Sequence, residues 1–203
     1  PRFEMNGWCS SLYSSAGTTY NNTTSGRDTM DHRGESERAN AVRDMFSRIA
    51  VRYDLMNRIV TGGQDIRWRR QVIRKAQLRP GSRLLDIGTG TGDLASEARK
   101  QIPDIRVAAA DFTVEMLRVG QEKGRQDFTA ADALRLPFPD CTFDGVVSGF
   151  LMRNVVGRAL ALREQRRVLK AGGRIVILDT TRPQRSLVSP LVAFHMHVVI
   201  PAL

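Results

Sequence analysis

A glycine-rich loop that follows a short apolar stretch restricts the possible folds more than any other feature. Residues 83–87 read Arg-Leu-Leu-Asp-Ile, a predicted buried strand, and residues 88–92 read Gly-Thr-Gly-Thr-Gly before a predicted helix begins near Leu94. Glycines between a strand and a helix let the backbone approach a ligand closely at the carboxyl end of the strand. A lone glycine loop is weak evidence, because any tight turn uses glycine. Its interpretation therefore depends on the surrounding residues.

From this loop onward, predicted strands and helices alternate. Helices are predicted near 94–100, 114–119 and 159–169, and strands at 83–87, 106–110, 128–131, 145–148 and 174–178. Strands that alternate with helices at this spacing indicate a parallel, doubly wound sheet. The predicted fold class is α/β, with a Rossmann-like sheet.

The chain divides into two predicted parts. Residues 1–38 are rich in Ser, Thr, Gly and Asn without an apolar pattern, so we expect a disordered or non-native segment. Residues 39–203 are expected to form one domain, with a helical cap over 42–79, a Rossmann-like core over 80–183 and a shortened carboxyl-terminal part. In the cap, Thr61-Gly62-Gly63 separates two predicted helices.

The net charge of +10 fits nucleic acid, an anionic membrane surface or a solvated basic face. The predicted helix over 66–77 shows a basic face formed by Arg67, Arg69, Arg70, Arg74 and Lys75. The aromatic and basic interleaving typical of single-stranded RNA binding is missing, so no nucleic acid partner is expected. No apolar run approaches the roughly 20 residues of a membrane-spanning helix. Cys9 and Cys141 have no partners at metal-ligand spacing, so no metal site is expected.

Two carboxylates indicate which ligand the glycine loop binds. The dinucleotide pattern requires glycine at 93, where this chain has Asp93, and Asp86 precedes the loop. Both would repel an anionic pyrophosphate. S-adenosylmethionine carries no phosphate; acidic residues suit its ammonium and sulfonium groups, and backbone N–H groups at a helix start suit its carboxylate. The loop with Gly88, Gly90 and Gly92 therefore favours this methyl donor as cofactor.

Two further carboxylates follow the next predicted strands. Asp111 ends the second strand, 25 residues after Asp86, where it can accept both hydroxyls of a ribose. Capping the following helix is the alternative role, although Thr113 is better placed for it. Asp132, followed by Ala133, comes after the third strand and can accept the adenine amino group; an ordinary loop aspartate is an equally good interpretation.

Two longer motifs are more specific than the glycine loop: Tyr-Asp-Leu-Met-Asn at 53–57 and Phe-Leu-Met-Arg-Asn-Val at 150–155. Together with Trp68-Arg69, Leu-Pro-Phe-Pro-Asp at 136–140 and Gly172-Gly173, they make residues 42–183 resemble the demethylmenaquinone and polyprenyl-benzoquinol C-methyltransferases. The resemblance implies a class I methyltransferase fold and S-adenosylmethionine-dependent methylation of a prenylated quinol ring in menaquinone or ubiquinone biosynthesis. Demethylmenaquinol is the favoured acceptor.

The resemblance also implies residues on both sides of the reaction. The implied and inferred donor contacts are Asp86, Gly88, Gly90, Thr91, Gly92, Asp111, Phe112, Asp132, Ala133 and Ser148. The quinol reacts faster once its hydroxyl is deprotonated, so a base or a network that stabilises the phenolate is needed. The candidates are Tyr53, Asp54, Asn57, Arg153 and Asn154. Arg153 is the most suggestive as a cation beside the phenolate, and a structural ion pair is its equal alternative.

Two departures from the family pattern have consequences. The family usually has Gly where this chain has Leu151, so we expect a reshaped acceptor pocket. The family also continues beyond Leu203, so the last helix and the closing antiparallel strands are expected to be missing.

A prenylated substrate resides in the bilayer, so the basic helix is expected to hold a cytoplasmic enzyme peripherally against anionic headgroups. Two alternatives stay open: a methyltransferase for another small molecule or RNA, and a donor-binding protein without turnover. No oligomeric state is predicted.

Overall fold

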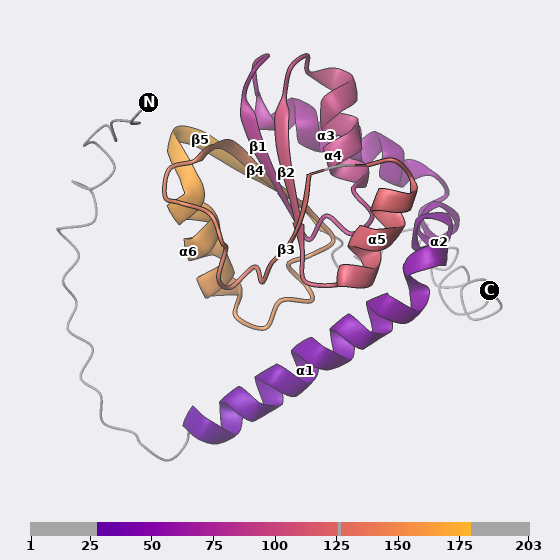
Figure 1. Cartoon of the computed structure of the whole chain (residues 1–203), viewed down its shortest axis with the longest axis vertical. Helices are drawn as coiled ribbons and strands as arrows, with labels where there is room; N and C mark the ends of the chain where they lie inside the picture. The colour runs from indigo at the N-terminus through magenta and orange to yellow at the C-terminus, as the bar shows by residue number, and fades with distance from the viewer. Residues whose placement is uncertain (1–27, 126, 180–203) are drawn as a thin grey trace, which may run out of the picture.

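A five-stranded parallel sheet forms the centre of the computed structural model (Figure 1), which describes residues 28–125 and 127–179. The strands are β1 (Arg83–Ile87), β2 (Arg106–Asp111), β3 (Phe128–Ala130), β4 (Phe143–Gly149) and β5 (Leu169–Leu178), in the order β3-β2-β1-β4-β5. All four pairings are parallel. The strand order reverses between β1 and β4, and such a switch point opens a crevice at the carboxyl ends of the strands. The predicted doubly wound, Rossmann-like fold is confirmed.

The helices form a cap and two layers. They are α1 (Asp28–Ile49), the 3-10 turn η1 (Ala50–Arg52), α2 (Tyr53–Val60), α3 (Gln64–Ala76), α4 (Asp93–Gln101), α5 (Val114–Glu122) and α6 (Arg158–Val168). The long helix α1 projects from the body of the molecule, and its carboxyl-terminal half lies near α5 (Figure 1). Within the described ranges, none of the helices combines the length and the apolar character needed to span a bilayer.

Alternation along the strands creates two apolar cores, one on each face of the sheet. In β1, Leu84 packs with Val72 and Ile73 of α3 and with residues of α4. The neighbouring Leu85 and Ile87 point to the other face, which Val168 of α6 covers. Successive side chains of a strand point to opposite faces, and a strand that is covered on both faces is therefore apolar throughout. This arrangement holds the carboxyl ends of the strands, and the loops that follow them, in fixed positions.

Two sequence-based boundaries need correction. Helix α1 begins at Asp28, so disorder up to residue 38 was wrong for residues 28–38. The boundary rested on missing apolar periodicity, but residues 35–43 are rich in Glu, Arg and Ala, which are strong helix formers. The strand predicted at 174–178 begins earlier, at Leu169, and its pairing with β4 shifts register between Phe143 and Gly145. The segments 1–27 and 180–203, including the expected loss of the closing strands, lie outside the described residues.

Candidate functional site

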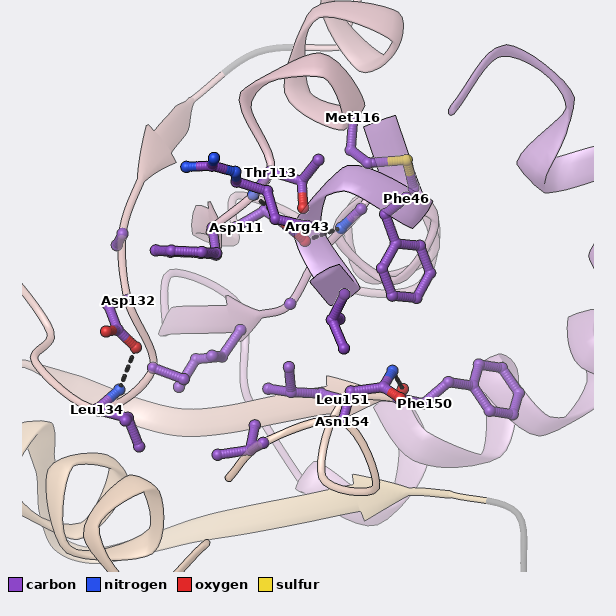
Figure 2. A pocket seen from close by; sticks show the side chains of 18 of the residues that line it. Arg43, Phe46, Asp111, Thr113, Met116, Asp132, Leu134, Phe150, Leu151 and Asn154 are labelled. Atoms are coloured by element: carbon purple, nitrogen blue, oxygen red, sulfur yellow. Dashed lines mark hydrogen bonds between the residues drawn. The ribbon is translucent and has the colours of Figure 1, made fainter. Parts of the chain in front are cut away.

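A cavity of about 370 Å³ lies at the carboxyl ends of the strands, at the switch point of the sheet (Figure 2). Its walls come from the glycine loop, from the loops after β2, β3 and β4, and from the cap. Small-molecule sites commonly have volumes of roughly 300 to 1,000 Å³. The lining includes Arg43, Phe46, Tyr53, Gly88, Gly90, Asp111, Phe112, Thr113, Met116, Asp132, Ala133, Leu134, Phe150, Leu151 and Asn154.

Asp111 fixes the glycine loop from the end of β2. Its Oδ2 accepts the N–H of Gly90 at 2.7 Å, and its Oδ1 accepts the N–H of Thr113 at 2.8 Å. Thr113 is the N-cap residue of α5, but its side chain makes no capping hydrogen bond. Each oxygen of the carboxylate has a second lone pair, and Asp111 lines the cavity. Burial raises its pKa, against the lowering effect of these hydrogen bonds.

The side of the cavity that was predicted for adenine carries Phe112, Asp132 and Ala133. Asp132 accepts the N–H of Leu134 through Oδ1 at 2.9 Å (Figure 2), and within the described part of the chain no hydrogen bond reaches its Oδ2. The ring of Phe112 is 43% exposed, and the Arg43 guanidinium lies 5.9 Å from its centre. The structure therefore brings these three predicted residues together with Asp111 and Gly90.

Asp86 does not reach the cavity. Its side chain is fully buried; Oδ2 accepts the Thr89 hydroxyl at 2.6 Å and the Ala95 N–H at 3.1 Å. Burial is the main cause that raises the pKa of Asp86 to about 7. Asp86 thus connects the start of the glycine loop to α4. The expectation that it faces the cationic groups of the donor is not supported by this geometry.

Asp93 is also directed into the protein. It forms ion pairs with Arg69 and Arg125, both at 2.7 Å. Arg69, which was predicted on a solvated basic face, is only 8% exposed. Sequence alone placed Arg69 outside because its helical neighbours are basic, whereas the buried Asp65 and the partly buried Asp93 compensate its charge.

Thr91 and Ser148, both predicted donor contacts, lie outside the cavity lining. The Thr91 side chain is 2% exposed, and its hydroxyl donates to Asp54 at 2.7 Å. Ser148 is fully buried within β4, and its hydroxyl has no hydrogen-bond partner among the described residues. Gly92 likewise does not line the cavity.

On the acceptor side, the cavity receives two of the five predicted residues, Tyr53 and Asn154. Tyr53 packs edge-on against Phe46, with ring centres 5.7 Å apart. Burial raises the pKa of Tyr53, so its hydroxyl stays protonated at neutral pH. The Asn154 amide donates to the backbone oxygen of Phe150 at 3.3 Å.

The other three predicted acceptor-side residues do not line the cavity. Asp54 contacts Lys123 and Thr91, and Asn57 lies one helical turn further along α2. Arg153 pairs with Asp179 at 3.8 Å, with its side chain 44% exposed. Its guanidinium also lies 5.4 Å from the centre of the Phe150 ring. Burial raises the pKa of Tyr53, and the positive charge of Arg153 is one of the smaller effects that oppose this rise.

Several site residues carried no motif signal. Arg43 lines the cavity from α1, and the sequence placed it only in the predicted helical cap. Arg125 contacts Thr91 of the glycine loop and Lys123 contacts Asp54 on α2, although both residues simply follow the predicted helix of residues 114–119. Leu151 was noted as a departure from the family pattern, and the structure places it on the cavity wall against Gly88. A Cβ atom at Gly88 would lie 2.8 Å from Leu151 Cδ1, so Leu151 covers the loop closely.

Comparison with known proteins gives matches over most of the chain. Residues 32–203 match the model of the ubiE/COQ5 methyltransferase family. The ubiquinone/menaquinone biosynthesis C-methyltransferase UbiE of Geobacter sulfurreducens is 41% identical over 83% of this chain and 69% of its own length. The protein of the same name from Desulfotalea psychrophila is 44% identical over 80% of this chain and 67% of its own length.

Solved structures show the same fold. A SAM dependent methyltransferase from Aquifex aeolicus superposes with a TM-score of 0.52 and 26% identity, covering 58% of this chain and 66% of that one.

Proposed function

The chain belongs to the ubiE/COQ5 methyltransferase family and is an S-adenosylmethionine-dependent methyltransferase, and we propose that it methylates a ring carbon of a prenylated quinol, with demethylmenaquinol preferred. One observation carries the proposal. A single cavity joins the donor-type wall of Gly90, Asp111 and Asp132 to a second wall with Tyr53 and Asn154. Methyl transfer is an in-line displacement, so catalysis depends on holding donor and acceptor in one such space.

The donor wall fits S-adenosylmethionine. Asp111 lines the cavity and already accepts the N–H groups of Gly90 and Thr113, and we infer that its carboxylate also accepts a ribose hydroxyl. Asp132 Oδ2 is available for the adenine amino group, and the exposed ring of Phe112 offers an apolar face beside it. When bound, the cofactor supplies a methyl group activated by the positive sulfonium. The chain contributes the orientation of that group toward the acceptor wall.

On the acceptor wall, we propose that Tyr53 and Asn154 bind the ring oxygen next to the reacting carbon. Tyr53 is protonated at neutral pH, and burial raises its pKa further, so it can donate a hydrogen bond to the developing phenolate. Asn154 can donate the remaining hydrogen of its amide. The charge of Arg153 would add electrostatic stabilisation from outside the cavity lining, without direct contact. Asp54 and Asn57 have no direct role in this scheme.

We also propose that the enzyme works at the cytoplasmic face of a membrane, where a prenylated quinol meets a water-soluble donor. Helix α3 supplies exposed basic residues for anionic headgroups: Arg67, Arg70, Arg74 and Lys75. Each basic residue near such a surface contributes about 1 kcal/mol. Binding to vesicles with phosphatidylglycerol should fall in Arg67→Gln/Arg74→Gln. It should not fall in Arg118→Gln/Arg163→Gln, which removes two exposed charges elsewhere. Equal losses would contradict a role for α3.

The decisive experiment is incubation with radiolabelled S-adenosylmethionine and one of three acceptors. These are a short-chain demethylmenaquinol, a short-chain 6-methoxybenzoquinol and bulk RNA. Label in the naphthoquinol ring, faster than in the benzoquinol, is expected. Faster labelling of the benzoquinol would overturn the ring preference. Label in RNA alone, or donor binding without any transfer, would overturn quinol methylation itself.

A further inference from the structure

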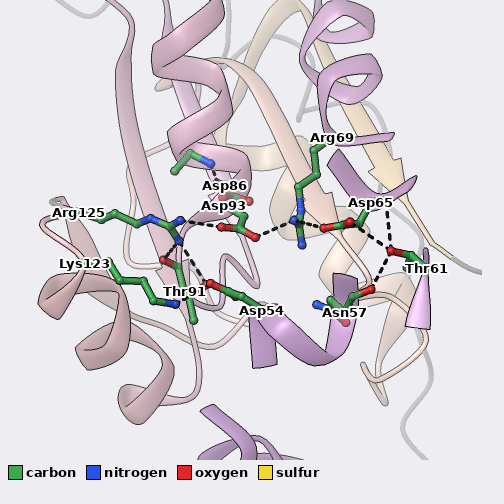
Figure 3. A network of polar contacts seen from close by, with 11 residues as sticks. Asp54, Asn57, Thr61, Asp65, Arg69, Asp86, Thr91, Asp93, Lys123 and Arg125 are labelled. Atoms are coloured by element: carbon green, nitrogen blue, oxygen red, sulfur yellow. Dashed lines mark hydrogen bonds and ion pairs between the residues drawn. The ribbon is translucent and has the colours of Figure 1, made fainter. Parts of the chain in front are cut away.

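A ring of polar contacts begins on α2 and runs through the glycine loop (Figure 3). Asp54 on α2 accepts hydrogen bonds from the Thr91 hydroxyl at 2.7 Å and from Lys123 Nζ at 2.6 Å. Arg125 donates to the backbone oxygen of Thr91 and, at 2.7 Å, to Asp93. This half of the ring therefore connects four segments: α2, the glycine loop, the region after α5 and the start of α4.

The other half returns to α2 through α3. Asp93 also contacts Arg69 Nη1 at 2.7 Å, and Arg69 contacts Asp65 Oδ2 at 2.6 Å. The Thr61 hydroxyl lies 3.1 Å from Asp65 Oδ1 and 2.7 Å from the backbone oxygen of Asn57. Since Asn57 and Asp54 belong to the same helix, the ring is closed.

The charges of the ring balance. Its three carboxylates, Asp54, Asp65 and Asp93, face three cations, Arg69, Lys123 and Arg125. Side-chain exposure ranges from 0% at Asp65 to 38% at Lys123, so much of the ring is shielded from water. Partial burial strengthens such hydrogen bonds and makes the loss of one partner costly.

Asp54 is poorly suited to act as a base. Burial alone would raise its pKa, but the hydrogen bonds from Lys123 and Thr91 hold the pKa below its usual range. Its side chain also points at Thr91 and Lys123, while the preceding residue, Tyr53, lines the cavity. Helix α2 therefore places Tyr53 on the acceptor wall and binds the glycine loop through Asp54.

We propose that Asp54 is a positioning residue for the methyl donor, which sets the glycine loop at a fixed position relative to the acceptor wall by holding Thr91. This inference rests on the proposed methyltransferase function, because it assigns a donor to the glycine loop. Thr91 follows Gly90, which lines the cavity and is held on its other side by Asp111. Without Asp54, the loop would lose its fixation to α2, while the contacts from Asp86, Asp111 and Arg125 would remain.

The test compares Asp54→Asn with Asp144→Asn. Asp144, near the amino end of β4, likewise accepts one lysine ammonium, Lys170 at 2.7 Å, and one further donor, the Arg83 N–H at 2.8 Å. It does not line the cavity. The two variants thus remove similar charge from similar contacts, and only one of the sites touches the glycine loop.

The dissociation constant of S-adenosylhomocysteine is measured by calorimetry, and kcat, the donor KM and the pH profile are measured on the full chain. Because Asp54→Asn weakens one of the contacts that fix the glycine loop, it should weaken donor binding by about ten-fold. The pH profile of turnover should not move, and Asp144→Asn should stay within about two-fold of the parent protein in donor affinity.

Donor affinity in Asp54→Asn equal to that in Asp144→Asn would overturn the proposal, as would a shifted pH profile with unchanged donor affinity. Thr91→Val provides a second route and applies even if Asp54→Asn does not fold. It should weaken donor binding similarly, and the double variant should lose no more than either single one. Full additivity would contradict action through Thr91. Because binding is read without an acceptor, failure of quinol methylation is distinguished from failure of this inference.

Discussion

At the scale of single residues, Asp86 shows how burial changes the role of a carboxylate. Its position before the glycine loop suggested a partner for the cationic donor, yet its side chain is enclosed between Thr89 and Ala95. Its Oδ1 has no hydrogen-bond partner among the described residues. Burial disfavours the charged form of the carboxyl, so the group tends to keep its proton. This burial is the main cause that raises the pKa of Asp86 to about 7.

The raised pKa of Asp86 predicts a pH-dependent stability. In the unfolded chain the carboxyl titrates near 3.8, so between about pH 4 and 7 the folded protein binds the extra proton. The free energy of unfolding therefore falls as pH rises through this window, by roughly 1.4 kcal/mol per pH unit. Asp86→Asn removes this contribution. In urea unfolding at pH 5, 6, 7 and 8, the free energy of unfolding of the variant relative to that of the parent protein should increase up to pH 7.

Asp111 also has a raised pKa. Because both proteins contain Asp111, its pH-dependent contribution largely cancels when their free energies of unfolding are subtracted. A difference in unfolding free energy that stays constant from pH 5 to 8 would show that Asp86 is ionised when folded.

Arg153 gives a second prediction at this scale. It lies outside the cavity lining, so it does not touch the donor wall, but its charge reaches Tyr53. Arg153→Ala should lower kcat by about ten-fold or more and leave the dissociation constant of S-adenosylhomocysteine unchanged. Arg153→Lys keeps the charge and should recover part of kcat. Equal losses in turnover and donor affinity would instead identify Arg153 as part of the structural pair with Asp179.

At the scale of elements, the approach of α5 to the glycine loop depends on Gly120. A Cβ atom there would lie 2.5 Å from Phe128 Cζ and 2.7 Å from the backbone oxygen of Thr91. The Thr91 oxygen cannot yield without moving the loop, so Gly120→Ala should lower the free energy of unfolding by roughly 1 to 3 kcal/mol. It should also weaken donor binding. Chemical denaturation and calorimetry check both.

Gly157→Ala is the matched control for Gly120→Ala. Its Cβ atom would lie 3.3 Å from the flexible end of Leu134 and 3.8 Å from Leu160 Cβ, and it would approach no backbone atom this closely. This change should be close to neutral in stability and in donor affinity. A Gly120→Ala protein that behaves like the control would show that α5 can shift away from the loop without consequence.

Element order was predictable because its causes are local. The apolar pattern of residues 83–87 predicts a strand, and the glycines that follow predict a turn. Asp111 was predicted as a site residue because it lies at the end of a strand. Bonds between distant segments were not predictable. Lys123 meets Asp54 across 69 residues, and Arg125 meets Asp93 across 32. Nothing local distinguishes these two cations from the chain's other basic side chains, so Asp54 was assigned to the acceptor until its partners were visible.

At the scale of the whole molecule, the polar ring makes the cap and the donor side of the sheet one mechanical unit. The ring includes α2, α3, the start of α4 and the residues after α5, whereas α6 and β5 take no part in it. A ligand that binds only the folded state stabilises the elements that its site couples together. Donor binding should therefore stabilise elements well beyond the glycine loop.

Hydrogen exchange tests this coupling. With S-adenosylhomocysteine bound, amide exchange should slow in the glycine loop at 88–92 and also in α2 and in the last turn of α5. It should change little in α6, which packs on the opposite face of the sheet. In Asp54→Asn, protection of the loop should persist at saturating ligand while protection of α2 is lost, because the connection from loop to helix is broken. Slower exchange confined to 88–92 in the parent protein would mean that the cap responds independently of the donor.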